Sequence, residues 1–167
     1  CITRQLPGIT SGVTYTRFVR KGIVKVYEDG SEFPIGKGVV LHESDKDVAT
    51  IITSGIMVDE SLKAYEALQA EGISVRVIDM FTWKPLDEEL VVRAARETGK
   101  IVTVEEHSVI GGLGSAVCDA VSGACPCVVK KIGVEDSFGM SGPAVELLKK
   151  FGLSAENIVE KVRELVR

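Results

Sequence analysis

Short apolar runs alternate with amphipathic stretches along most of this chain. Four of the runs have the length and β-branched content of strands: residues 48–53, 73–78, 101–104 and 128–134. The stretches between them carry apolar residues at helical spacing, and two further helices are expected to end the chain. Strands that alternate with helices in this way are typical of βαβ units. We therefore predict a three-layer α/β/α sandwich around a mostly parallel, five-stranded sheet, with its first strand within residues 36–41.

Capping residues mark the boundaries of the predicted helices. Gly72 ends the first of them, and Asp87 begins the next with an acidic first turn that Gly99 closes. Ser154 is placed to cap the last helix. These signals fix the helical segments more sharply than apolar spacing alone.

The first 46 residues follow a different pattern, because short β-prone runs are mixed there with turn signals. Residues 13–19 have strand character, and residues 24–27 precede an Asp-Gly pair, which is a strong hairpin signal. The sequence therefore predicts a short β-rich connector, including a small hairpin, in front of the α/β domain.

Composition indicates a globular chain and argues against nucleic-acid binding and membrane insertion. Hydrophobic residues make up 45% of the 167 residues and charged residues 26%, which is typical of a folded domain. The net charge is -4 and basic residues are interspersed with acids, so nucleic acid is not an expected partner. The longest uncharged apolar stretch, residues 48–58, is shorter than the roughly 20 residues that span a bilayer. We expect no membrane partner and a cytoplasmic location.

The first residue and the cysteines add two expectations. The chain begins at Cys1 rather than at methionine, which indicates processing or a fragment of a longer protein. Cys125 and Cys127 flank a proline, but a second pair that would complete a tetrahedral zinc site is missing. We expect reduced thiols and no metal site.

Ligands of open α/β sheets bind outside the carboxyl ends of the parallel strands, so the residues after each strand are the candidate site. These positions are Gly55, Asp79, the segment 105–107, and the pair 135–136. Glu105, Glu106 and His107 could form an acid–base group, since a carboxylate tunes a nearby imidazole. The alternative is a structural or partner-contacting role. We favour it because adjacent residues on an extended backbone point in different directions and no nucleophile is placed nearby.

The glycines that follow this segment also permit two interpretations. Gly111, Gly112 and Gly114 open a helix, and their backbone amides could hold a phosphate. The spacing lacks the third glycine of a dinucleotide fingerprint, which favours close packing of the helix instead. Upstream, Arg17 and Arg20 end a strand-like run, where they could hold a phosphate or form a solvated basic edge.

Four segments, in their order along the chain, resemble the C-terminal domain of the transketolase family. They are VATIITSGIMV, EGISVRVIDMFTWKPLDEE, ETGKIVTVEEHSVIGGLGSAV and KKIGVEDSFGMSGPAVELLKKFGLSAENIV, and the resemblance extends from about residue 36 to the C-terminus. Deoxyxylulose-phosphate synthases and the beta subunits of 2-oxo-acid dehydrogenases share this domain. The EEH segment before GGLGSA and the later FGMSG resemble the transketolase branch most, especially its split bacterial form.

Further upstream, TYTRFVRKG resembles the strand that ends the family's pyrimidine-binding domain. The resemblance implies that Arg20 contacts the phosphate of a sugar substrate. It also implies that residues 1–35 are the remnant of that domain with a linker, and that residues 36–167 are the C-terminal α/β domain.

The family transfers a two-carbon ketol unit between phosphosugars with thiamin diphosphate and Mg²⁺. Its catalytic glutamate and its GDG metal motif belong to other domains, and neither context occurs in this sequence. The resemblance therefore implies a chain with no catalytic residue, cofactor or metal of its own, inactive alone. Its implied partners are the remaining transketolase domains or an N-terminal subunit, within a homodimer.

Two other functions are compatible with the sequence. One is an interaction module that docks a catalytic partner, as the C-terminal domain of a dehydrogenase beta subunit or a deoxyxylulose-phosphate synthase would. The other is a nucleotide-binding regulator that uses the loop from Gly111 to Gly114.

Overall fold

The computed structural model of this chain describes residues 2–19 and 24–167. Its five strands are β1 (Val39–His42), β2 (Thr50–Thr53), β3 (Arg76–Asp79), β4 (Lys100–Ser108) and β5 (Val128–Val134). Its five α-helices are α1 (Met57–Ala70), α2 (Glu88–Thr98), α3 (Leu113–Ala124), α4 (Ala144–Lys150) and α5 (Ala155–Val166). Two short 3-10 helices, Ile2–Arg4 and Leu6–Gly8, precede them.

The strands form one sheet in the order β1-β3-β2-β4-β5. Strands β2 to β5 run parallel, and β1 joins the edge of β3 in the antiparallel direction. In the centre, Ile52 lies opposite Ile78 on one side and Thr103 on the other. The prediction of a five-stranded, mostly parallel sheet is confirmed.

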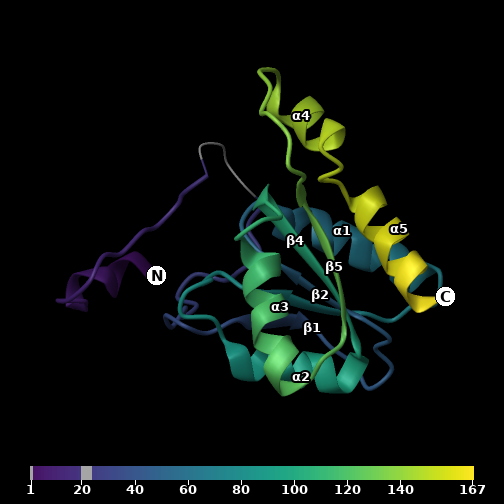
Figure 1. Cartoon of the computed structure of the whole chain (residues 1–167), viewed down its shortest axis with the longest axis horizontal. Coiled ribbons are helices and arrows are strands. Elements are labelled where there is room, and N and C mark those ends of the chain that lie inside the picture. The colour runs from purple at the N-terminus through teal and green to yellow at the C-terminus, as the bar shows by residue number, and fades with distance from the viewer. Residues whose placement is uncertain (1, 20–23) are drawn as a thin grey trace.

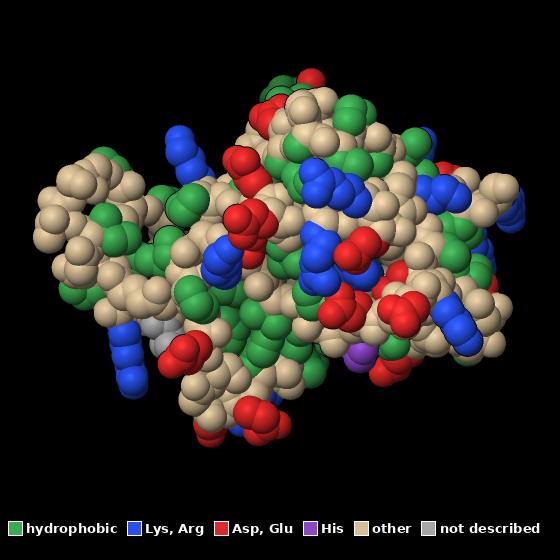
Figure 2. Space-filling model, turned by 90° about the horizontal axis from the view of Figure 1, so that it is seen from below, with side chains coloured by type: hydrophobic (Ala, Val, Ile, Leu, Met, Phe, Trp, Pro, Cys, Tyr) green, Lys and Arg blue, Asp and Glu red, His purple; other side chains and the backbone are tan. Residues whose placement is uncertain are grey.

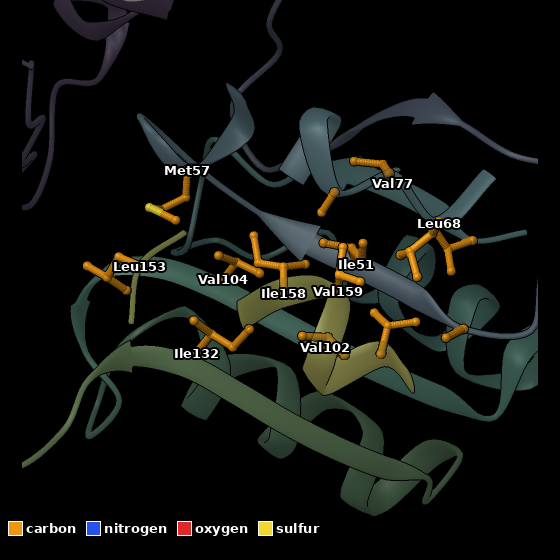
Figure 3. Packing of buried hydrophobic residues seen from close by; sticks show 14 residues of the cluster. Ile51, Met57, Leu68, Val77, Val102, Val104, Ile132, Leu153, Ile158 and Val159 are labelled. Carbon is orange, nitrogen blue, oxygen red and sulfur yellow. The ribbon is translucent and has the colours of Figure 1, made fainter. Parts of the chain in front are cut away.

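Helices cover both faces of this sheet and complete the three predicted layers (Figure 1). On one face, β2 and β4 place Ile51 and Val102 against α1 and α5, which contribute Leu68 and Ile158 (Figure 3). On the other face, neighbouring strand residues, including Ile52, pack against α2 and α3. Alternate residues of each central strand thus enter different cores, as the two-residue period of a strand requires.

The predicted capping residues act where the sequence places them. The side chain of Asp87 accepts a hydrogen bond from the amide of Leu90 at 3.2 Å, and Gly99 ends the same helix in the left-handed region at φ 65°. Ser154 accepts from the amide of Asn157 at 3.4 Å and begins α5. The boundaries of α2 and α5 are therefore fixed by local chemistry.

Two predictions about strands are wrong. The connector is not β-rich: residues 2–19 and 24–38 contain no strand in the described part of the chain, and only a turn remains of the hairpin, where the amide of Ser31 donates to the carbonyl of Glu28. A strand needs a neighbour for its backbone groups, and no strand within residues 2–19 and 24–167 pairs with these segments. Strand β4, in contrast, continues past Val104 to Ser108, so that residues 105–107 belong to the strand itself.

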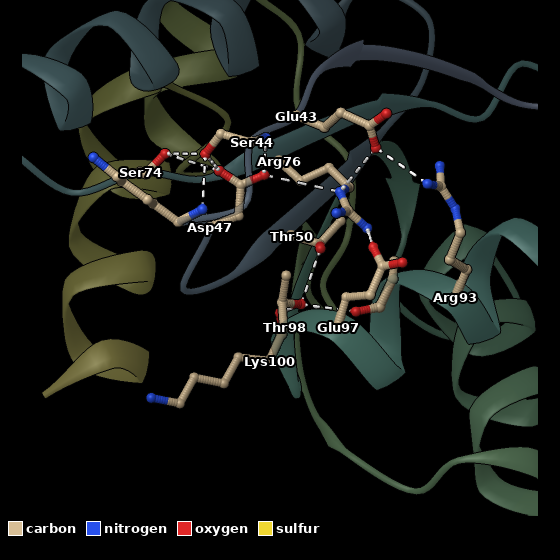
Figure 4. Close-up of polar contacts among 12 residues, drawn as sticks. Glu43, Ser44, Asp47, Thr50, Ser74, Arg76, Arg93, Glu97, Thr98 and Lys100 are labelled. Carbon is tan, nitrogen blue, oxygen red and sulfur yellow. Dashed lines mark hydrogen bonds and ion pairs between the residues drawn. The ribbon is translucent and has the colours of Figure 1, made fainter.

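A buried arginine organises the amino end of the sheet (Figure 4). Arg76 begins β3 with its side chain 6% exposed, and its guanidinium forms ion pairs with Glu43, Asp47 and Glu97. Glu43 also pairs with Arg93 of α2 at 3.2 Å. This network joins three segments at the end of the sheet opposite to the candidate site.

The surface view shows Lys and Arg side chains interspersed with Asp and Glu on the face displayed (Figure 2). Among the helices of residues 2–19 and 24–167, none is long and apolar enough to cross a membrane.

Candidate functional site

The carboxyl ends of the central strands open into a cleft of about 2020 Å³. Gly55 after β2, Asp79 of β3 and Glu106 of β4 line it, together with the N-terminal segment and parts of α1, α4 and α5. Three of the predicted crevice positions are thus brought together. Glu135 and Asp136, the fourth predicted position, are exposed and do not line this cleft.

Asp79 is the most deeply placed carboxylate of the cleft. Its side chain accepts a 2.6 Å hydrogen bond from the hydroxyl of Tyr27 at Oδ2. Its other oxygen, Oδ1, is buried and has no hydrogen-bond partner among the described residues. Burial raises the pKa of Asp79 from its usual 3.8 to about 6, and the bond from Tyr27 opposes that rise. Burial, with the nearby carboxylate, also raises the pKa of Tyr27.

Aromatic rings hold the N-terminal segment beside Asp79. Tyr27 meets Phe33 edge to face with ring centroids 4.8 Å apart, and Phe33 meets Phe81 in the same manner at 5.2 Å. Tyr27 and Phe33 precede the sheet, whereas Phe81 follows β3. The sequence identified Asp79 as a crevice position but could not identify Tyr27 as its partner, since 52 residues separate them.

Glu105 points away from the cleft and into the protein. It is fully buried, and its two carboxylate oxygens accept hydrogen bonds from the amides of Leu113 at 2.7 Å and Gly114 at 2.8 Å. These amides belong to the first turn of α3, where a helix dipole and free N–H groups attract an anion. The protein's own carboxylate thus occupies the anion position of this helix.

The glycines of this loop permit that close approach. A Cβ on Gly112 would overlap the carboxylate of Glu105, and a Cβ on Gly114 would lie 2.6 Å from Thr103 Oγ1. Gly111 adopts φ 73°, which favours glycine. Since the amides that would bind a phosphate already donate to Glu105, the loop does not fit a phosphate. Its geometry matches the alternative of close helix packing.

Glu106 turns toward the cleft and is bound by the N-terminal segment. The guanidinium of Arg17 donates to its backbone carbonyl at 2.9 Å and to its carboxylate at 3.1 Å. Arg17 is therefore paired with an acid rather than free to hold a phosphate. Arg20, the predicted contact for a sugar phosphate, lies outside the described residues.

His107 is 45% exposed and does not line the cleft, because it points to the other side of β4 from Glu106. Its Nδ1 lies 2.9 Å from the carbonyl of Ser108 and 3.8 Å from Glu105 Oε2. The ring meets Trp83 edge to face at 5.5 Å, and the indole N–H of Trp83 donates to Ser54 at 3.2 Å. Glu105 and His107 thus approach each other on one side of β4, whereas Glu106 pairs with Arg17 on the other, so the three do not converge on one point.

Three cysteines gather around the end of α3. Cys118, Cys125 and Cys127 are free thiols that are partly buried. Burial raises the pKa of Cys127, and the two neighbouring thiols raise it further, which disfavours the thiolate. Within residues 2–19 and 24–167, no group of three His, Cys, Asp or Glu side chains is arranged to hold a metal ion.

Known transketolase proteins are similar to this chain in sequence. Residues 36–158 match the family model "Transketolase, C-terminal domain". The chain is 44% identical over 154 residues to the 6-deoxy-6-sulfo-D-fructose transketolase subunit SqwH of Clostridium sp. (strain MSTE9), covering 92% of this chain and 47% of that protein. It is 42% identical to the putative transketolase C-terminal section of Methanocaldococcus jannaschii, covering 92% and 48%.

A solved structure with a similar fold is that of a split-gene transketolase, an inactive beta4 tetramer. It is 48% identical in sequence with a TM-score of 0.83, over 88% of this chain and 48% of that one. The chain therefore spans about half the length of the curated relatives and of the solved chain that it matches.

Proposed function

Because this chain belongs to the transketolase family and matches its C-terminal domain, we propose that it works as part of an enzyme that moves a two-carbon ketol unit between phosphosugars. The observation that carries the proposal is the continuous similarity to a split-gene transketolase chain in both sequence and fold. In this proposal residues 36–167 form the C-terminal domain, and residues 1–35 are the end of the preceding pyrimidine-binding domain with its linker.

The coenzyme of this proposed enzyme is thiamin diphosphate with a divalent metal ion. The loop from Gly111 to Gly114 does not fit the diphosphate, because the amides of Leu113 and Gly114 donate to Glu105. The described residues thus offer no phosphate cradle at this loop. The proposal therefore assigns coenzyme and metal to the preceding domains or to a separate subunit, and assigns no catalytic residue to this chain.

The contribution of this chain is then a scaffold that contacts the rest of the enzyme. Large apolar side chains project from its surface on the N-terminal segment and after β5: Val13 is 99% exposed, Tyr15 86% and Phe138 97%. Exposed apolar groups of this size are typical of surfaces that a partner covers. We propose that the remaining transketolase domains or an N-terminal subunit, within a homodimer, cover them.

Activity of the isolated chain is not expected. Glu106 points to the other side of β4 from Glu105 and His107, and Glu105 is committed to the first turn of α3. The solved relative is itself an inactive beta4 tetramer. We therefore propose that this chain is inactive alone and that activity requires the other transketolase domains.

A domain replacement tests this function. Residues 36–167 would replace the C-terminal domain of an active transketolase, and ketol transfer from a ketose phosphate to an aldose phosphate would be measured. We expect a rate within about tenfold of the parent, a barrier change of about 1.4 kcal/mol at most. The parent truncated before this domain is the control and should lose activity. A chimera that binds the coenzyme and assembles like the parent, yet transfers no ketol unit, would contradict the proposal.

A further inference from the structure

The segment that leads into the sheet is fastened across the carboxyl end of β3. Its residues 24–36 are attached by the hydrogen bond from Tyr27 to Asp79 and by the contact of Phe33 with Phe81. At its end, the amide of Gly36 donates to the hydroxyl of Thr82 at 3.1 Å. We refer to residues 24–36 as the strap.

Beneath the strap lies a carboxylate with incomplete hydrogen bonding. Asp79 is 5% exposed, Tyr27 satisfies one of its oxygens, and the other has no partner among the described residues. A buried carboxylate with an unsatisfied oxygen is costly when charged and much less costly when protonated. Lifting the strap would let water reach both oxygens.

We propose that the strap closes over the carboxyl end of β3 while Asp79 is protonated, and opens more readily once Asp79 is ionised. Opening uncovers Asp79 and one wall of the cleft, because Tyr27 and Phe33 line the cleft beside it. The strap is thus a cover for the edge of the sheet at which ligands of α/β folds bind. This inference goes beyond the proposed function and does not depend on it.

The pH response of the strap is assigned to Asp79 because most of the charged groups around it are already paired. Tyr27 is the titratable group that is hydrogen-bonded to Asp79 in the described part of the chain. The charged groups that line the cleft are Arg17, Lys25 and Asp29 of the N-terminal segment, Asp59, Glu60 and Lys63 of α1 with Glu71 after it, Glu106 of β4, Lys149 of α4, and Glu156 and Arg163 of α5. Most of them are paired with an opposite charge: Arg17 with Glu106, Lys25 with Asp29, Lys63 with Asp59 and Glu60, and Arg163 with Glu71.

The direction of the response follows from linkage. The closed state raises the pKa of Asp79 from 3.8 to about 6, so the closed state binds the proton more tightly than the open one. Closure is therefore favoured most below about pH 4, weakens as the pH rises, and reaches its weakest level above about pH 6. The difference in pKa corresponds to an opening equilibrium that increases by about 100-fold across this interval.

Hydrogen exchange of the whole chain, followed by mass spectrometry and corrected for the intrinsic rate at each pH, measures this opening. We expect the protection of strap amides such as Gly36 to fall by about 100-fold between pH 4 and pH 7. Amides of β2 and β4 serve as the internal reference and should keep their protection. Equal loss of protection in the strap and in these strands would show global unfolding and overturn the proposal.

Matched substitutions assign the effect to one carboxylate. Asp79→Asn keeps the shape and an oxygen for Tyr27, and should make strap protection independent of pH. Asp29→Asn, an exposed acid within the strap, should leave the pH response as in the unmodified chain. Tyr27→Phe removes only the hydroxyl and should lower strap protection at every pH. A flat response in the unmodified chain, an unchanged response in Asp79→Asn, or full protection in Tyr27→Phe would each overturn the proposal.

Discussion

Glu105 and Leu113 are joined by a 2.7 Å hydrogen bond that places a buried carboxylate at the first residue of α3. In many α/β proteins the amino end of such a helix faces a phosphate group of a ligand. Here a strand of the same chain supplies the negative charge, and Gly114 donates a second bond to it. The glycine-rich loop therefore allows β4 and α3 to pack closely, with Glu105 bound to the first turn of the helix.

Glu105→Ala should lower the free energy of unfolding by about 3 kcal/mol, since it leaves two buried amides without an acceptor. Glu105→Gln should cost less, about 1–2 kcal/mol, because one oxygen can still accept. Glu106→Ala is the neighbouring control and should cost under about 1 kcal/mol, as it removes a surface ion pair. Urea unfolding of the three variants gives these values. Equal losses for Glu105→Ala and Glu106→Ala would contradict the capping role.

Gly112→Ala should be destabilising by about 2–3 kcal/mol through steric overlap with Glu105. Its φ of -94° is accessible to alanine, so backbone strain does not contribute. Gly123 lies at the other end of α3 with open space around it, and Gly123→Ala should be stabilising by about 0.5–1 kcal/mol. Thermal unfolding distinguishes the two. A neutral Gly112→Ala would show that the loop does not approach Glu105 closely.

Asp79 should make the stability of the chain depend on pH. Because folding raises its pKa from 3.8 to about 6, the folded state binds more protons in this interval, and stability falls as the pH rises through it. Asp79→Asn removes this penalty, so at pH 7 the variant should be more stable by up to about 3 kcal/mol. Urea unfolding should show a smaller difference in the free energy of unfolding between Asp79→Asn and the unmodified chain at pH 4 than at pH 7. A larger difference at pH 4 would contradict a raised pKa of Asp79.

Arg76→Ala should cost about 3–5 kcal/mol, because it leaves Asp47, with its side chain 2% exposed, without its cationic partner. Arg93→Ala removes the exposed pair with Glu43 and should cost under about 1 kcal/mol. Added salt should reduce the effect of the second substitution more than that of the first. Chemical unfolding at low and high ionic strength provides the comparison, and similar costs for both variants would be evidence against a buried network.

Local chemistry explains which parts of the fold the sequence predicted. Asp87, Gly99 and Ser154 act within a few residues of themselves, so their capping roles could be inferred from sequence alone. The alternating runs likewise defined the sheet, because each central strand buries both faces. The resemblance to the transketolase C-terminal domain agreed with the same segments.

Interactions between distant residues explain what the sequence did not predict. The apolar run predicted a strand that ends at Val104, yet β4 continues because Glu105 has a partner eight residues later, in a helix. The hairpin of the connector failed because a β-prone run cannot form a sheet without a neighbouring strand. The pairing of Tyr27 with Asp79 has no signal in spacing, since 52 residues intervene.

We propose that this chain is a scaffold and that its partners hold the coenzyme. Isothermal titration of the isolated chain with thiamin diphosphate and Mg²⁺ measures whether the chain binds the coenzyme itself. We expect no heat of binding at millimolar coenzyme, under conditions in which a complete transketolase titrates normally. A micromolar dissociation constant, about -8 kcal/mol of binding free energy, would contradict it.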